Sequence, residues 1–232
     1  MINKPDYDRA AAAAMQLLVD YHHREMQINK DYHAETPVNP MPILISYPGV
    51  RVLPYTSMAL DAGMDRKDLI FLFGNVDAAT FHLDLPGMDD VKYVVVYNMR
   101  LPLEIIWRAI ARELGHIVLG HDGVTRSMEA RMQEAICFAH HFTSPRPVLN
   151  FLRQSGLPFT LNVLTNTTGC AEECVQEMQT IPGAHVPAEL NAQVRDLYVP
   201  HLREYVDFYQ ASHKKDTSPL LDLGTFMDNY EE

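Results

Sequence analysis

The strongest constraint on the fold is a run of apolar residues after Asn98 that recurs at spacings of three and four. This periodicity is typical of an amphipathic helix with one buried face. Pro102 suits the first turn of such a helix, and Gly120 and Gly123 suit its end. The apolar positions are Leu103, Ile106, Trp107, Ile110, Leu114, Ile117 and Val118. The pattern therefore predicts a helix over residues 103–119 that packs one stripe against a core.

A second helical pattern runs from about Ser127 to Phe142 and stops at the sequence SPRP. Glu134 on this second helix lies eighteen residues beyond His116 on the first. That spacing lets a helical hairpin fold the Glu134 carboxylate back toward the His116 imidazole. We therefore expect the two helices to bring an acid and an imidazole together.

Three short segments around this helix pair have the composition of strands. GVRVLPY and AATFHLD are candidates, and VKYVVVYN is the strongest because it is dense in β-branched and aromatic residues. An alanine-rich segment over residues 7–27 predicts a first helix, which Pro37, Pro40 and Pro42 interrupt. The fold class expected is α+β, with a small, mostly antiparallel sheet beside a zincin-like helical pair.

The rest of the chain is predicted to be helical, near residues 146–155, 161–166, 171–179 and 188–209. The sequence FTLNVLTNTTGCAEECVQEMQ has the outline of a helix-turn-helix, but its second helix is acidic. A packed helical hairpin or a surface for a protein partner is therefore the favoured interpretation, since recognition helices present basic or amide side chains to bases.

The sequence suggests a division into three parts. Residues 1–155 form a metallopeptidase-type domain, residues 156–212 a helical C-terminal region, and residues 213–232 a polar and acidic tail. Because the tail shows no sustained periodicity, we expect it to be loosely docked.

Composition narrows the classes of partner. The formal net charge of -11 repels phosphate backbones, so the expected partner is a protein or peptide and not a nucleic acid. No apolar run reaches membrane-spanning length, and the N-terminus lacks the cations of a signal peptide, so we expect a soluble protein of the cytoplasm. Three cysteines imply no disulfide framework, and Cys170 and Cys174 are interpreted as two ordinary helix cysteines.

The chemistry of the first helix is concentrated in the sequence ARELGHIVLGHDG. With histidine in place of Arg112 it would contain H-E-x-x-H, which puts two imidazoles on one helix face to hold zinc. In a zinc peptidase of this type the intervening glutamate activates the bound water, and a residue from a following helix completes the ligand set. Glu113 and His116 occupy two of the three positions in the motif.

RAIARELGHIVLGHDG followed by EAICFAHHFTSPRPVL resembles the ImmA/IrrE family of metallo-endopeptidases, which are gluzincin-like. The resemblance covers most of residues 5–155 in order. It implies zinc ligands at His116 and Glu134 and a general base at Glu113. It also implies a protein of bacterial or mobile-element genomes that cuts or binds regulatory proteins such as transcriptional repressors.

Arg112 is the departure from that pattern. A guanidinium has no free lone pair for zinc, and it places a positive charge where the cation would sit, so zinc is expected to be weakly bound or absent. We expect Arg112 to contact Glu134, Glu113 or both, with its charge replacing that of zinc. Cys137 is the nearer substitute ligand, and His121 is expected to point elsewhere unless the helix ends abruptly.

Two functions from different classes follow. The first is an ImmA/IrrE-like protein that acts on a cytoplasmic regulatory protein, by zinc-dependent peptide hydrolysis if metal is retained, and catalytically impaired by Arg112. The second is a non-catalytic pseudopeptidase that keeps the cleft to bind a protein or peptide. A DNA-binding regulator built on the helical C-terminal half is a weaker third hypothesis, because the charge is acidic.

Overall fold

The computed structural model describes residues 4–61, 63–65, 67–68, 76–83, 90–122, 126–212 and 219–227, apart from the side chains of residues 224 and 225. The elements follow one another as α1 (Tyr7–Ile28), α2 (Pro40–Ser46), β1 (Val50–Pro54), α3 (Tyr55–Asp61), β2 (Ala78–His82), β3 (Tyr93–Tyr97), α5 (Leu103–Val118), α6 (Met128–Thr143), α7 (Arg146–Gln154), α8 (Leu161–Thr168), α9 (Glu172–Met178), α10 (Ala188–Ala211) and the 3-10 helix η1 (Gly224–Met227). Helices and a small sheet occur together, which confirms the α+β class.

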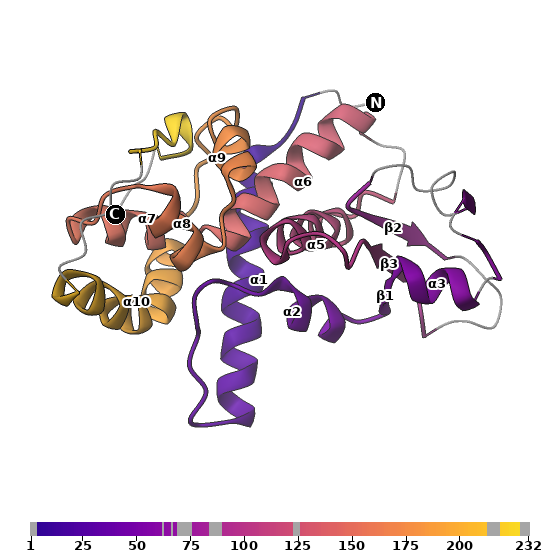
Figure 1. The fold of residues 1–232 in the computed structure, drawn as a ribbon, viewed down its shortest axis with the longest axis horizontal. Coiled ribbons are helices and arrows are strands. Elements are labelled where there is room, and N and C mark those ends of the chain that lie inside the picture. The colour runs from indigo at the N-terminus through magenta and orange to yellow at the C-terminus, as the bar shows by residue number, and fades with distance from the viewer. Residues whose placement is uncertain are drawn as a thin grey trace.

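The molecule is arranged around the helices α1, α5 and α6. Figure 1 shows the sheet on one side of these helices and α7 to α10 on the other. A continuous core of buried apolar side chains includes residues from both sides, such as Val95 of β3 and Leu149 of α7. In the part of the chain that the structure describes, no helix combines the length and the apolarity needed to cross a membrane.

The sheet is mixed, which corrects the expectation of a mostly antiparallel one. In the described residues the strand order is β1-β3-β2, with β1 parallel and β2 antiparallel to β3. All three predicted strands are confirmed, and Val95 and Val96 of the central strand are fully buried. Alternating apolar residues and β-branched side chains identify a strand, but they do not show whether its neighbour runs parallel or antiparallel to it. For β1 and β3 that direction depends on the long connection between them.

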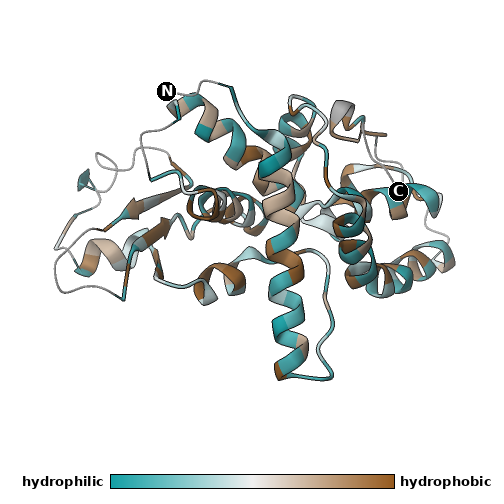
Figure 2. Ribbon diagram, turned by 180° about the vertical axis from the view of Figure 1, so that it is seen from behind, coloured by the Kyte–Doolittle hydropathy of each residue, from teal (hydrophilic) through white to brown (hydrophobic). Residues whose placement is uncertain are grey.

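Helix α1 packs against α6 and α10 and buries several alanines. Ala10, Ala11 and Ala14 have no exposed surface, and small side chains let two helix backbones approach closely. Asp6 caps the helix by accepting a hydrogen bond from the Arg9 N–H at 3.1 Å. The second half of α1 extends beyond the rest of the molecule (Figure 1), and Figure 2 shows mostly hydrophilic residues there.

Helices α5 and α6 form the predicted pair, and their bounds differ by only a residue or so from those expected. A side chain at Gly115 would place its Cβ 3.0 Å from the Phe138 ring, so only glycine allows this close approach. Ser127 begins α6 by accepting a hydrogen bond from the Ala130 N–H at 3.2 Å. The pair is thus held rigidly at the centre of the molecule.

The sequence did not predict α2 and α3. Pro40 and Pro42 were interpreted as breaks, but Pro40 begins α2 after Asn39, whose side chain accepts from the Met41 N–H. Proline is compatible with a first helical turn because its missing N–H would have no partner there.

Part of the expected loose tail is packed into the core. Leu223 and Phe226 are buried, and the Phe226 ring centroid lies 4.6 Å from that of His141. The expectation of a loosely docked tail is therefore wrong for residues 219–227. The few apolar residues of this segment do not recur at a regular spacing, so no sequence pattern indicated that they are buried. Residues 213–218 and 228–232 lie outside the described part, and the division of the chain at residues 155 and 212 stays a prediction.

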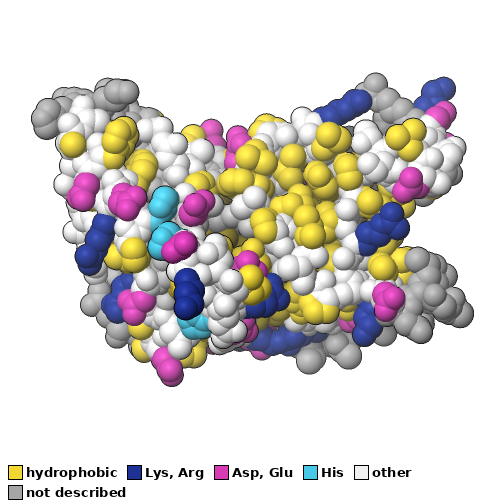
Figure 3. Space-filling model, turned by 90° about the horizontal axis from the view of Figure 1, so that it is seen from below, with side chains coloured by type: hydrophobic (Ala, Val, Ile, Leu, Met, Phe, Trp, Pro, Cys, Tyr) yellow, Lys and Arg dark blue, Asp and Glu magenta, His cyan; other side chains and the backbone are white. Residues whose placement is uncertain are grey.

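One face of the molecule carries grouped hydrophobic side chains, as Figure 3 shows from below. Among the exposed apolar residues are Ile45 of α2, Met99 and Leu103. Large contiguous apolar patches mark interaction surfaces, whereas single exposed apolar residues are ordinary.

Two buried histidines make the fold acid-sensitive. His22 contacts the hydroxyls of Tyr32 and Tyr198, each at 2.7 Å, and burial lowers its pKa from 6.5 to about 4. Burial likewise lowers the pKa of His141 to about 3. A group with a depressed imidazole pKa is protonated first in the unfolded state, so stability falls as pH decreases through this window.

We predict that the free energy of unfolding falls as pH decreases from about 6.5 to about 4, by about 3 kcal/mol from His22 alone. Urea unfolding at several pH values measures this slope. His22→Asn, which cannot titrate, should show a shallower slope than the parent. His33→Asn, at an exposed position, should keep the parent's slope, and equal slopes in all three proteins would contradict the assignment.

Candidate functional site

The candidate site lies where α5 ends and α6 begins. Helix α5 supplies Arg112, Glu113 and His116, and α6 supplies Glu134. Glu113 and Glu134 are buried, Glu134 with no exposed surface, while Arg112 and His116 are half-buried. The helix pair therefore places the predicted site residues in one region.

The turn that follows α5 brings a further residue, His121, into the site. Gly120 adopts φ 64, a left-handed conformation that glycine tolerates, and the His121 N–H donates to the His116 carbonyl at 2.9 Å. No atom lies within 4 Å of a Cβ built at Gly120, so the demand for glycine comes from its backbone angle. The helix ends abruptly, and the chain reverses so that His121 points back into the site rather than elsewhere.

His121 links the two predicted zinc ligands. Its Nδ1 lies 2.9 Å from His116 Nδ1, and its Nε2 lies 2.9 Å from Glu134 Oε2. Only 3% of the His121 side chain is exposed. The ring therefore stands between the imidazole and the carboxylate and uses one nitrogen on each.

Burial sets the charge states of His116 and His121, which stand in a row with Glu134. Burial, with a smaller effect of His121, lowers the pKa of His116 to about 4, and burial also lowers the pKa of His121 against the opposing effect of Glu134. Both imidazoles are then neutral at pH 7. His121 donates from Nε2 to the carboxylate, and its Nδ1 accepts a hydrogen bond from His116 Nδ1.

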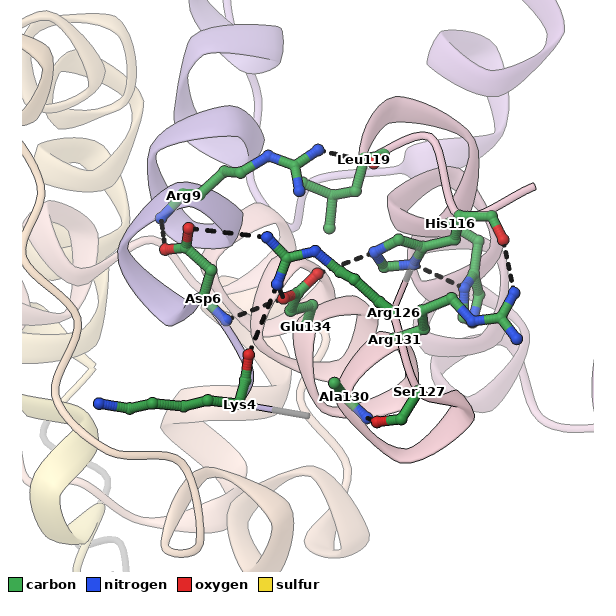
Figure 4. Close-up of polar contacts among 11 residues, drawn as sticks. Lys4, Asp6, Arg9, His116, Leu119, Arg126, Ser127, Ala130, Arg131 and Glu134 are labelled. Carbon is green, nitrogen blue, oxygen red and sulfur yellow. Dashed lines mark hydrogen bonds and ion pairs between the residues drawn. The ribbon is translucent and has the colours of Figure 1, made fainter. Parts of the chain in front are cut away.

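Glu134 has two further partners, on its other oxygen. Oε1 accepts from Arg126 Nη1 at 2.5 Å and from the Asp6 N–H at 2.8 Å. Arg126 also lies near the Lys4 carbonyl and the Asp6 carboxylate. Figure 4 shows these groups converging on Glu134 from the start of α1 and the segment before α6. The buried carboxylate is therefore fully compensated.

Two other arginines hold the turn that carries His121. Arg9 Nη2 donates to the Leu119 carbonyl at 2.6 Å, and Arg131 Nη1 donates to the His121 carbonyl at 2.7 Å. These carbonyls follow the last helical turn and have no partner within the helix. The turn is thus fixed by side chains from α1 and α6 (Figure 4).

Arg112 contacts Glu113. Its Nε lies 3.6 Å from Glu113 Oε1, while the Thr80 hydroxyl donates to Glu113 Oε2 at 2.8 Å. This confirms one of the two contacts expected for Arg112, whereas Glu134 is bound by Arg126 and His121 instead. Burial raises the pKa of Glu113, and Thr80 and Arg112 act to lower it.

Cys137 is not brought to this row of side chains. Its Sγ lies 3.6 Å from the Tyr7 carbonyl and 3.6 Å from His141 Nδ1. Burial raises the pKa of the Cys137 thiol to about 12, so it stays protonated, and a thiol is a poor zinc ligand.

The zinc implied by the resemblance does not fit the residues as they are arranged. A zinc ion needs its ligand atoms at about 2.0–2.2 Å around one point. His121 turns one nitrogen to His116 and the other to Glu134, so the three residues stand in a row instead of around a point. Among the described residues, no three His, Cys, Asp or Glu side chains are grouped to hold a metal ion.

A cleft nevertheless remains beside this row. A cavity of about 440 Å³ lies between strand β2 and the helices α5 and α6. Thr80 and His82 line one side, while Arg112, His116 and Met132 line the other. The cleft thus combines apolar, charged and backbone surfaces, as binding sites for peptides and small molecules do.

Sequence reasoning placed His121 in the site only if the helix ends abruptly, and it missed Arg126. The signal for His121 was the glycine at position 120, since a left-handed residue directly after a helix turns the chain back. Arg126 lies eight residues before Glu134 and outside the helical pattern, so its spacing carried no signal.

A comparison with family models agrees with this architecture. The Peptidase_M78 model, described as the IrrE N-terminal-like domain, matches residues 69–156. The match includes β2, β3, α5 and α6, and therefore supports a metallopeptidase-like fold around the cleft. No curated protein and no solved structure matches the chain.

We predict that Arg126→Ala destabilises the protein by about 3–5 kcal/mol, because it leaves a buried carboxylate uncompensated. Adding Glu134→Gln to that variant should recover part of the loss, since the orphaned charge is then gone. Arg195→Ala breaks an exposed pair with Asp196 and should cost at most about 1 kcal/mol. Chemical denaturation compares the four proteins, and equal stability of Arg126→Ala and the parent would refute the compensation.

Proposed function

We propose that this chain, whose residues 69–156 match the Peptidase_M78 model of the IrrE N-terminal-like domain, is a pseudopeptidase. In this proposal it binds a segment of a regulatory protein in the cleft beside β2 and does not hydrolyse it. The kind of partner follows from the resemblance to proteins that cut or bind regulators. The loss of hydrolysis follows from the geometry of the site.

The observation that carries the proposal is the position of the His121 ring. It occupies the space between His116 and Glu134, and each of its nitrogens is engaged there. Arg126 supplies the positive charge that a metal ion would otherwise bring to Glu134. Protein groups therefore satisfy the buried carboxylate without a cation.

Glu113 supports the same conclusion. A general base must have an oxygen within hydrogen-bond reach of the water it activates. The two Glu113 oxygens face Thr80 and Arg112. These contacts tie the carboxylate to β2 and to its own helix, and so give it a role in shaping the wall of the cleft.

Strand β2 supports peptide binding. Among the described strands it pairs only with β3, and the Leu83 N–H donates to the Lys92 carbonyl across that pair. Residues alternate along an antiparallel strand, so the backbone groups of His82 and Thr80 point to the opposite edge. The Thr80 hydroxyl donates to Glu113, whereas the end of the strand at His82 borders the cleft.

An extended peptide can add to such an edge through its main chain. Its alternate side chains would then face the mixed wall formed by α5 and α6. Met128 and Met132 offer adaptable apolar contacts, and Arg112 and Asp122 offer charged ones. The cleft is therefore suited to recognise a peptide even without hydrolytic chemistry.

The first test is zinc content. We predict that protein purified without chelator carries well under one zinc per chain, and that His121→Gln alone does not raise this value. Arg112→His combined with His121→Gln should approach one zinc per chain, because it restores an imidazole donor and removes the ring from the centre of the site. Elemental analysis measures this, and a full complement of zinc in the parent protein would favour a hydrolase instead.

The second test addresses peptide binding. We predict that His82→Pro weakens, at least about tenfold, the binding of peptides selected from a displayed random library, because it removes an N–H on the outer edge of β2. His82→Ala is the matched control, since it loses the side chain and its contact with Asp122 but keeps the N–H. Equal loss in the two variants, or none in either, would exclude pairing along this edge.

A further inference from the structure

The two walls of the cleft are held in a fixed register, and α5 sets it at the start of β2. Arg108 Nη2 of α5 lies 3.4 Å from the carboxylate of Asp77, which directly precedes the strand. About one and a half turns further along the helix, Glu113 accepts from the Thr80 hydroxyl at 2.8 Å. Arg112 lies between these two contacts on α5 and lines the cleft, so it borders the first half of β2.

Asp122 is aligned with the other end of the strand. Its Oδ2 accepts from the Tyr93 hydroxyl at 3.0 Å and lies 3.9 Å from His82 Nε2. Tyr93 and His82 are paired across β3 and β2, at the residue where β2 ends. Asp122 lines the cleft as Arg112 does. The cleft therefore has a cation beside the first half of β2 and an anion at the end of the strand.

Arg112 keeps most of its hydrogen-bonding capacity. Its Nε lies 3.6 Å from Glu113 Oε1, and within the described part of the chain neither Nη1 nor Nη2 has a hydrogen-bond or ion-pair partner. A guanidinium presents five N–H groups in a planar fork that matches a carboxylate. The side chain is 17% exposed and lines the cleft, so its Nη groups can reach a carboxylate that enters there.

Asp122 has a free oxygen for a ligand of the opposite charge. The contacts of its carboxylate with Tyr93 and His82 are both on Oδ2, and it forms no ion pair with any lysine or arginine among the described residues. Its side chain is 34% exposed. Oδ1 can therefore accept from a basic side chain that lies along the end of β2.

The other charged groups of the cleft have structural partners. The two Glu113 oxygens face Thr80 and Arg112. Arg131 Nη1 donates to the His121 carbonyl at 2.7 Å, and the Arg131 Nε is buried, so this guanidinium is committed to the turn after α5. The two imidazoles beside that turn are hydrogen-bonded to each other at 2.9 Å. The charges best placed to meet a ligand are therefore the one at position 112 and the one at position 122.

We infer that the cleft selects an extended peptide with an acidic side chain against Arg112 and a basic side chain against Asp122. This inference rests on the proposed function, because it takes a peptide paired with the outer edge of β2 as given. Side chains alternate between the two faces of a strand, so the two charged residues must be an even number of positions apart. The four steps from Ala78 to His82 span about 13 Å, so the separation is two or four positions.

The first experiment selects binders of the full-length chain from a random peptide library. The peptides are displayed as internal fusions, so that no free terminus competes for the guanidinium. We predict that selected peptides are enriched in one acidic and one basic residue two or four positions apart. Pairs three positions apart should not be enriched, because their side chains would face opposite sides of the peptide strand. Either order of the two charges supports the inference, and the order shows whether the peptide runs parallel or antiparallel to β2.

Two charge-neutral variants then assign each preference to one side chain, with binding measured by calorimetry. For the parent protein, replacing the acidic residue of a selected peptide with its amide should weaken binding at least about tenfold. In Arg112→Gln the acidic peptide and its amide form should bind equally, while the preference for the basic residue remains and shows that the variant is folded. Asp122→Asn should give the converse result. Arg195→Gln is the matched control, since it neutralises an exposed arginine of α10 and should keep both preferences.

The outcomes separate this inference from the proposed function. Peptides that lose binding in His82→Pro but show no charge preference would overturn the inference and leave peptide binding intact. A preference for acidic residues that survives in Arg112→Gln, or enrichment of charge pairs at odd spacing, would overturn it in the same way. If the library yields no binder at all, the proposed function fails and the inference fails with it.

Discussion

The buried carboxylate of Glu134 is the constraint on which the site depends. A carboxylate with no exposed surface must receive hydrogen bonds and positive charge from the protein, or it costs several kcal/mol. His121, Arg126 and the Asp6 N–H supply them from three different segments. The end of α5, the start of α6 and the start of α1 are therefore positioned together by a single side chain.

Charge balance supports the proposal that this metallopeptidase-like fold does without a metal ion. In a zinc site the cation neutralises the carboxylate and is surrounded by its ligands. Here Arg126 provides the charge, and the imidazole of His121 fills the space that the ion would need. Arg112 stands where the first histidine of H-E-x-x-H would stand, and its guanidinium lies beside Glu113.

The sequence was sufficient for the features that depend on periodicity. The apolar stripe after Pro102 predicted α5, the capping Ser127 lies where α6 was expected to begin, and the β-branched residues of 93–97 predicted the central strand. The pairing of His116 with Glu134 in one region followed from the helix hairpin. These are properties of single elements or of two neighbouring ones.

The features that the sequence did not reveal depend on one backbone angle or on distant contacts. The φ of Gly120 turned His121 into the site, and nothing in the helical pattern of residues 128–143 pointed to Arg126. The direction of β1 relative to β3 depends on a long connection, and the burial of Phe226 depends on a surface formed by α6 and α7. Periodicity carries no information about such contacts.

The hydrogen bond from Asp6 to Glu134 joins residues 128 positions apart in the chain. Contacts of such high sequence separation require a large loop to close, and they form slowly compared with helices and their local pairings. We therefore expect α5 and α6 to pair before the start of α1 reaches them. During that interval the Glu134 carboxylate has only His121 and Arg126 as partners, and the site gains its last hydrogen bond at the end of folding.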